Sequence, residues 1–155
     1  MAKDILIRKN GGSDTSVYGL SKWGIVATEL PFKIVGDMKD IPSNNWYDEN
    51  GDDEFIPTTP VYKAYEMEPK FIIEASSMET LIGNIREFIL FLANNGDFAM
   101  YNPNTSVGRT NIRYVSYSDE ATYNKLNTSD GVSYVCKFSL KLKVNNPIDN
   151  VVLNV

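Results

Sequence analysis

Five acidic residues fall within the seven positions of DENGDDE, residues 48–54, around a single glycine. Carboxylates at this density bind calcium or act as the acid and base of glycoside hydrolysis. In the register of an EF-hand loop, Asp48, Asn50 and Asp52 would take positions 1, 3 and 5. The glycine stands at position 4 rather than 6, however, and Thr59 replaces the glutamate of position 12. These three residues form a weak calcium candidate, and an exposed acidic turn explains the same pattern.

A carboxylate catalyst would need two acids held at a fixed separation, for which Asp52 and Glu54 are the candidates. Acids in a loop have no such fixed spacing, and catalytic pairs normally sit on rigid strands in a cleft. The chain has no histidine, which removes the commonest general base, the usual serine or cysteine triads and most transition-metal sites. We therefore predict no catalytic residues and no cofactor, and we expect Gly51 to supply the bend of a solvated turn.

The composition is that of a folded chain that avoids nucleic acid. Of the 155 residues, 43% are hydrophobic and 23% charged, so we expect one domain over residues 1–155. The net charge of −5 disfavours binding to a phosphate backbone. Neither a signal peptide nor an apolar stretch of membrane-spanning length is present, so we expect synthesis in a cytoplasm and no membrane insertion. The single cysteine, Cys136, lies in an alternating apolar run, which predicts a buried hydrophobic residue.

The first half of the chain predicts short strands separated by a long loop. Strands are expected at residues 4–8, 23–28 and 32–35. Prolines, asparagines and Gly51 break any regular element from Gly36 to Pro60, and loops of this length are usually functional or mobile. Alternation resumes in VYKAYEM and, after Pro69, in KFIIEA, which predicts a hairpin.

One amphipathic helix follows. Ser76 and Glu79 have the spacing of a capping box, and Asn94-Asn95-Gly96 predicts the end of the helix. Six apolar residues between them fall on one helical stripe: Leu81, Ile82, Ile85, Phe88, Ile89 and Leu92. Leu90 and Phe91 widen this stripe, which suggests either contact with a partner or a helix set deep in one core.

The remainder is rich in strand patterns. Strands are expected at residues 97–101 and 111–118, with loops at 103–109 and 119–131, and VVLNV at 151–155 predicts a last short strand. The longest signal is an alternation over thirteen residues, with one apolar face: Val132, Tyr134, Cys136, Phe138, Leu140, Leu142 and Val144. The predicted fold is mainly β (α+β), an antiparallel β-sandwich or rolled sheet with one amphipathic helix packed against it.

The capped helix SSMETLIGNIREFILFLANNGDFAMY, then RYVSYSD, then the long strand VSYVCKFSLKLKVNNP make up a familiar order. This order resembles the N-terminal ring domain of phage distal tail proteins and, more loosely, tail-tube proteins, from Val61 to Pro147. The resemblance implies a non-enzymatic virion subunit made in the bacterial host. It also implies self-association into a ring, usually a hexamer, with other tail proteins stacked above and below and DNA only passing through the lumen.

Two features depart from that resemblance. From a length of 155 residues we expect no second, carbohydrate-binding-like domain of the kind that many distal tail proteins have. The loop at 36–60 suits the long arm that tube subunits extend to a neighbour. The residues proposed for contact between copies are Leu90, Phe91, Trp46, Tyr47, Val151, Val152 and Leu153.

A second hypothesis is a small carbohydrate-binding β-sandwich module. Aromatic side chains stack on sugar rings, and Trp23, Trp46, Tyr47 and Tyr62 are the candidates.

Overall fold

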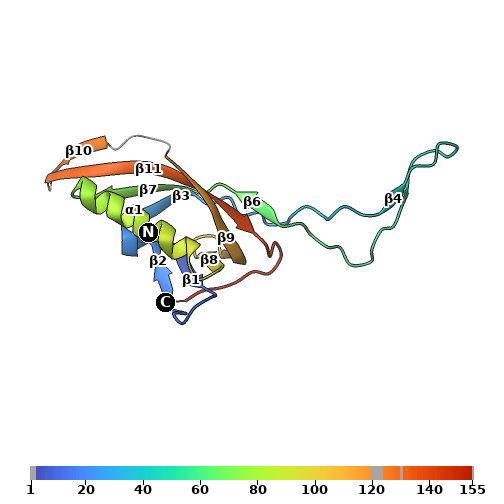
Figure 1. Cartoon of the computed structure of the whole chain (residues 1–155), viewed down its shortest axis with the longest axis horizontal. Helices are drawn as coiled ribbons and strands as arrows, with labels where there is room; N and C mark the ends of the chain where they lie inside the picture. Colours follow the sequence, from blue (N-terminus) through green and yellow to red (C-terminus); the bar gives the residue numbers. More distant parts are fainter. Residues whose placement is uncertain (1–2, 120–123, 130, 155) are drawn as a thin grey trace.

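A computed structural model describes residues 3–119, 124–129 and 131–154. It consists of a body, in which a curved sheet encloses one helix, and a long arm that projects from one end of it (Figure 1). The prediction of a mainly β fold with a single packed helix is confirmed.

One antiparallel sheet forms the body. Its strands run in the order β2-β1-β8-β9-β11-β7-β3, with β6 and β10 also paired to β11. The bounds are β1 Leu6–Lys9, β2 Val17–Gly19, β3 Ile25–Glu29, β6 Tyr65–Met67, β7 Lys70–Ala75, β8 Phe98–Asn102, β9 Val107–Asp119, β10 Asn124–Thr128 and β11 Gly131–Val144. Because these strands belong to one continuous sheet, the rolled-sheet alternative describes the fold.

Strand β11 is the central strand of this sheet. One edge pairs with β10 and then β9, and the other edge pairs with β7 and then β6. The predicted inward face is buried from Cys136 to Val144, whereas Val132 near the start of the strand is exposed. The strand alternates because one of its faces lies on the core and the other faces outward.

The predicted hairpin of VYKAYEM and KFIIEA is wrong. Strands β6 and β7 pair with successive stretches of the same edge of β11 instead of with each other. Only Glu68 and Pro69 separate them, and the Pro69 carbonyl accepts a 3.1 Å bond from the Leu140 amide. The chain thus continues along β11 through the proline, which has no amide hydrogen to donate to the sheet.

Five other local predictions differ from the structure. Residues 32–35 form no strand, Val107–Arg109 belong to β9 rather than to a loop, and residues 151–154 of the C-terminal VVLNV form no strand. The polar stretch predicted as a loop at 119–131 contains β10, which forms a hairpin with β11. Strand β3 begins at Ile25, because Leu20–Trp23 form a 3-10 helix that ends at Gly24 with a left-handed φ of 71°.

Helix α1, Met78–Ala93, is capped by Ser77 and not by Ser76. The Ser77 hydroxyl accepts a 3.2 Å bond from the Thr80 amide, which is the contact that Ser76 was predicted to make one residue earlier. At the other end, the buried ammonium of Lys9 donates to the carbonyls of Leu92 and Gly96 at 2.9 and 2.7 Å. A cation from β1 therefore satisfies carbonyls at the C-terminal end of the helix. Within the described residues, no helix is long and apolar enough to span a membrane.

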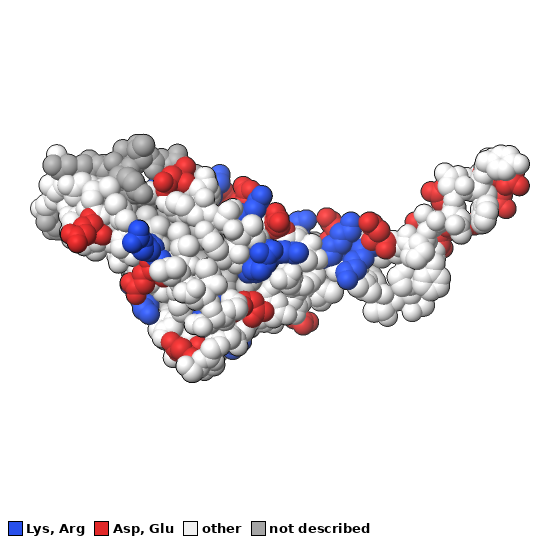
Figure 2. Space-filling view, viewed as in Figure 1, with Lys and Arg blue, Asp and Glu red and all other residues white. Residues whose placement is uncertain are grey.

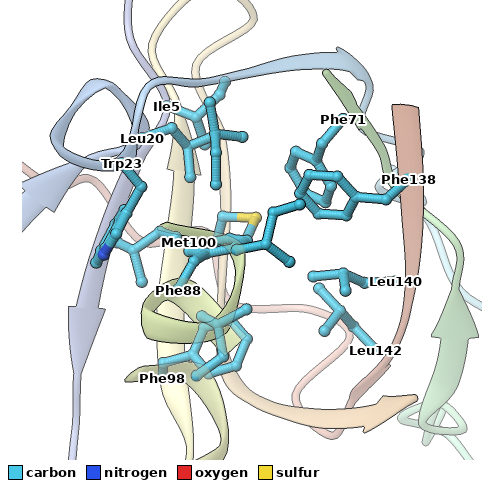
Figure 3. Packing of buried hydrophobic residues seen from close by; sticks show 14 of the residues in the cluster. Ile5, Leu20, Trp23, Phe71, Phe88, Phe98, Met100, Phe138, Leu140 and Leu142 are labelled. Atoms are coloured by element: carbon cyan, nitrogen blue, oxygen red, sulfur yellow. The ribbon is translucent and has the colours of Figure 1, made fainter. Parts of the chain in front are cut away.

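The helix presents Phe88 to the centre of the core (Figure 3). Its ring centroid lies 5.1 Å from that of Trp23, 5.9 Å from Phe71 and 6.5 Å from Phe138. Phe71 on β7 and Phe138 on β11 also stack on each other at 5.4 Å. Aromatic pairs in this range add to the stabilisation from burial alone.

We expect Phe88→Ala to lower the free energy of unfolding by about 3–5 kcal/mol, because it leaves a cavity among three other aromatic rings. Ile82→Ala, on the same helix but 43% exposed, should cost less than about 1 kcal/mol. Urea unfolding followed by tryptophan fluorescence measures both changes. Equal losses in the two variants would mean that the helix does not dock through Phe88.

Cys136 lies in this core and is fully buried. The pKa of its thiol is raised from the ordinary 9.0 to about 11. Burial is the larger cause, and the negative charge of the nearby Asp119 carboxylate is a smaller one. At pH 8 the protonated form therefore dominates more strongly in the folded chain than in the unfolded one, and the thiolate is the reactive species.

At pH 8 we expect the thiol to react with an aromatic disulfide reagent at least about 100-fold more slowly in the native chain than in denaturant. The released thiolate is followed by absorbance. Equal rates would show that Cys136 is accessible in the native state.

Candidate assembly surfaces

The arm, defined here as residues 34–63, occupies the stretch predicted as a long loop (Figure 1). Its two sides are joined near the body by the Lys39 amide bonded to the Val61 carbonyl at 2.8 Å and the Lys63 amide bonded to the Asp37 carbonyl at 2.7 Å. Further out, the two-residue strands β4 (Ser43–Asn44) and β5 (Asp53–Glu54) pair antiparallel. The predicted loop is thus an extended arm whose two sides are joined by backbone hydrogen bonds.

The acidic stretch forms the tip of the arm. Gly51 has a φ of 78°, as expected for the sharp bend, and Asp53 accepts a 3.0 Å bond from the Trp46 indole nitrogen. Across the described residues, no three acidic, cysteine or histidine side chains come together as a metal site would require. Asp48, Asn50 and Asp52 are all exposed. The geometry is that of a solvated turn.

Exposed apolar side chains gather on the arm. Eight of the fourteen large hydrophobic side chains that are exposed among the described residues lie on it: Ile34, Val35, Met38, Trp46, Tyr47, Phe55, Ile56 and Val61. Met38, Phe55 and Val61 line a shallow hollow of about 330 Å³ together with neighbouring prolines. So much apolar surface on one projecting segment is typical of a surface that another protein covers.

The arm contributes no side chain to the hydrophobic clusters described in the body. None of its residues belongs to the main core or to the smaller cluster formed by Leu6, Ala99, Tyr101 and Leu153 within the described part of the chain. Its apolar side chains therefore do not stabilise the fold of a single copy.

Charge is distributed unevenly along the arm. Figure 2 shows acidic residues toward its far end and lysine or arginine near the place where it leaves the body. Residues 42–60 contain five acids and no lysine or arginine. Lys33 and Lys63 near the root pair with Asp37 and Asp40 at 3.5 and 3.1 Å, but such exposed ion pairs contribute little stability.

The predicted contact residues of the helix divide into one exposed and one packed side chain. Leu90 is 50% exposed and lines an apolar hollow of about 280 Å³ with Ile82 and Tyr117. Phe91 packs inward, with its ring centroid 5.6 Å from that of Tyr18 and 5.1 Å from that of Trp23. Of the two residues that widen the apolar stripe, Phe91 therefore packs in the core, and Leu90 remains exposed on the surface.

The predicted contact residues at the C-terminus are also divided. Val152 is exposed and Val151 half-buried, whereas Leu153 is buried in the smaller cluster against Leu6 and Tyr101. The Val151 amide donates to the Gly108 carbonyl at 3.3 Å. This segment therefore lies along its own body, and Leu153 presents no surface to a neighbour in this arrangement.

The four aromatic residues proposed for sugar stacking do not form one surface. Trp23 is 1% exposed and belongs to the core, so its ring faces offer no platform. Tyr62 is half-buried at the root of the arm, in a bridge with Met38. Trp46 and Tyr47 alone remain exposed together, at the tip.

Sequence reasoning missed Phe55 and Ile56, which follow the acidic stretch, and Arg109, which lies buried at the arm's root. The proline-rich context made Phe55 and Ile56 look like loop residues, although two adjacent apolar side chains in a polar loop were a usable signal. Arg109 gave no signal, because a lone arginine in a predicted loop is normally exposed.

Comparisons with known proteins find a shared fold among solved structures. No protein-family model and no curated protein matches the sequence. Among solved structures, the chain is similar to SPP1 Dit (gp 19.1), described as a paradigm of the hub adsorption apparatus in phages that infect Gram-positive bacteria.

The similarity to SPP1 Dit has a TM-score of 0.61 at 16% sequence identity, and it covers 94% of this chain and 51% of that one. The chain therefore spans about half the length of the Dit protein. The expected resemblance to phage distal tail proteins is confirmed at the level of the fold, which the chain shares with SPP1 Dit.

Proposed function

We propose that this chain is a non-enzymatic structural subunit of a phage or prophage tail, a distal tail or tube component that closes into a ring of identical copies. The ring is a hexamer stacked between other tail proteins, with DNA only passing through its lumen. The subunit is made in the host cytoplasm and resides in the virion. The observation that carries this proposal is the exposed apolar arm on a body that shares its fold with a phage hub protein.

The arm supports contact with a second copy because it is long, apolar and unused by its own body. Burying one large apolar side chain yields about 1.5–3 kcal/mol, so four of the eight would yield roughly 6–12 kcal/mol. Association of two proteins costs about 4–15 kcal/mol in lost freedom. In a closed ring each copy gives one arm and receives one, so no arm is left uncovered.

The charge of the chain also suits this role. A net charge of −5 makes a channel wall that does not hold passing DNA. The uneven charge along the arm further favours a partner surface that is less acidic than the tip, since like charges repel.

We expect replacement of Phe55 and Ile56 by serine to raise the dissociation constant between copies at least about tenfold, because both side chains are exposed and apolar. Thr58→Ser with Thr59→Ser, on the same exposed segment, is the matched control and should leave association unchanged. Light scattering across a concentration series measures both. Equal association of the two variants would remove the arm's apolar side chains from the contact.

The purified wild-type chain should form closed rings visible by negative-stain electron microscopy, with a mass of about six copies by light scattering. Higher salt should not dissolve them, because burial of apolar surface and not surface charge holds the copies together. A chain that stays monomeric at high concentration, both alone and with its neighbouring tail proteins, contradicts the proposed function.

A further inference from the structure

Arg109 is buried at the junction between body and arm. It is the third residue of the predicted loop that falls in β9, after Val107 and Gly108, and its side chain is 4% exposed. Among the described residues it makes no ion pair with a carboxylate, and its Nε–H has no hydrogen-bond partner. Arginine is rarely buried without a paired acid, because removing a charge from water is costly. A buried arginine without a carboxylate partner therefore points to a specific role.

The guanidinium donates in two directions. Its Nη2 donates to the Lys33 carbonyl at 3.0 Å and the Ile34 carbonyl at 3.4 Å, where the chain enters the arm. Its Nη1 donates to the Gly108 carbonyl at 2.8 Å and the Asn150 side-chain oxygen at 3.3 Å. One planar group thus joins the start of the arm to β9 and to the C-terminal segment.

The C-terminal half of this junction is itself fixed. Asn150 accepts a 2.9 Å bond from the Gly108 amide and donates to the Ser106 carbonyl at 3.2 Å. A side chain on Gly108 would come within 2.0 Å of the Val151 carbonyl oxygen, so the two backbones touch there. The acceptor that holds one side of the guanidinium is therefore anchored to β9 at Gly108 and to the turn before it at Ser106.

The arm side of the junction has further contacts close by: the Lys63 amide donates to the Asp37 carbonyl at 2.7 Å, and a Cβ on Gly36 would lie 3.5 Å from the Pro147 Cβ. Besides Arg109, the Lys33 amide donates to the buried Tyr65 hydroxyl at 3.2 Å. Residues 32–35 form no strand, so the sheet does not hold them. A lysine could not replace the arginine, since an ammonium on a single carbon chain lacks the rigid fork that spans both groups of acceptors.

We propose that Arg109 is the positioning residue of the arm: its buried guanidinium clamps Lys33 and Ile34, where the chain enters the arm, to the C-terminal segment and so sets the direction in which the arm leaves the body. The inference rests on the proposed function only in assigning the arm to contact between copies, because the contacts of Arg109 lie within one copy. Its loss should leave the core intact and let the arm swing.

The test measures the spread of arm positions within one copy. Spin labels are attached through Glu49→Cys at the exposed tip and Glu87→Cys on the exposed side of α1, in a Cys136→Ala background diluted with unlabelled chain. Double electron–electron resonance then gives the distribution of the distance between the labels. We expect Arg109→Met to widen that distribution at least about twofold, because it removes every bond that the guanidinium makes to the arm.

Two variants provide the controls. Arg113→Met changes an exposed arginine on the same strand and should leave the width as in wild type. Arg109→Lys keeps the charge without the fork and should give an intermediate width. Hydrogen exchange of the backbone amides in the core strands is measured on the same variants. If Arg109 only stabilised the fold, its replacement would speed this exchange without widening the distribution of the distance between the labels.

Each outcome decides the proposal. A wider distribution in Arg109→Met with core protection retained supports the clamp; if that variant does not fold, Arg109→Lys replaces it under the same criterion. A width equal to wild type, an equal widening in Arg113→Met, or failure of both Arg109 variants to fold overturns it. Light scattering on the same samples reports assembly separately, so a chain that forms no ring but shows the widening rejects the proposed function and keeps the clamp.

Discussion

The contact between one face of α1 and the inner face of β7 and β11 determines the architecture of the body. Phe88 approaches Phe71 and Phe138 from the helix while those two rings stack across neighbouring strands. A single helix can cover a sheet this wide only if the sheet curves around it, since an uncovered strand face would leave apolar side chains in water. The curvature brings β1 and β8 to the same core, where Ile7, Phe98 and Met100 are fully buried. A flat sheet of the same strands would lose that enclosure.

The body and the arm follow different physical rules. Each body strand is held by neighbours and by a shared core, so its conformation follows from burial. The arm has a few backbone bonds between its sides and no buried apolar side chain, so little offsets the entropy lost in extending it. Its shape depends on its root, where a buried arginine and a tyrosine hydroxyl contact the backbone of residues 33 and 34. An error at that point would be magnified along the whole length of the arm.

Periodicity in the sequence predicted the elements that bury one face and expose the other. The alternation through Phe138 and the helical spacing through Phe88 both report a wet side and a dry side, and both elements were found. The pairing of strands was less predictable: β6 and β7 look like a hairpin, but both take the same edge of β11, which lies some seventy residues away in sequence. Residues 32–35 have the residue pattern of a strand, but in the structure they form no strand and lie where the chain enters the arm. The role of Arg109 depends on three segments distant in sequence, and no local pattern reports such a meeting.

The acidic charge at the tip of the arm affects which surfaces its exposed apolar side chains can contact. Eight exposed apolar side chains on a projecting finger would favour indiscriminate pairing between arms. Five carboxylates at the tip repel the tip of any second arm over about 10 Å at 0.1 M salt. Repulsion at this range opposes tip-to-tip contact and leaves the apolar sides free for a surface of different charge. In the proposed assembly, the charge of these acidic residues would therefore contribute to specificity through the contacts that it disfavours.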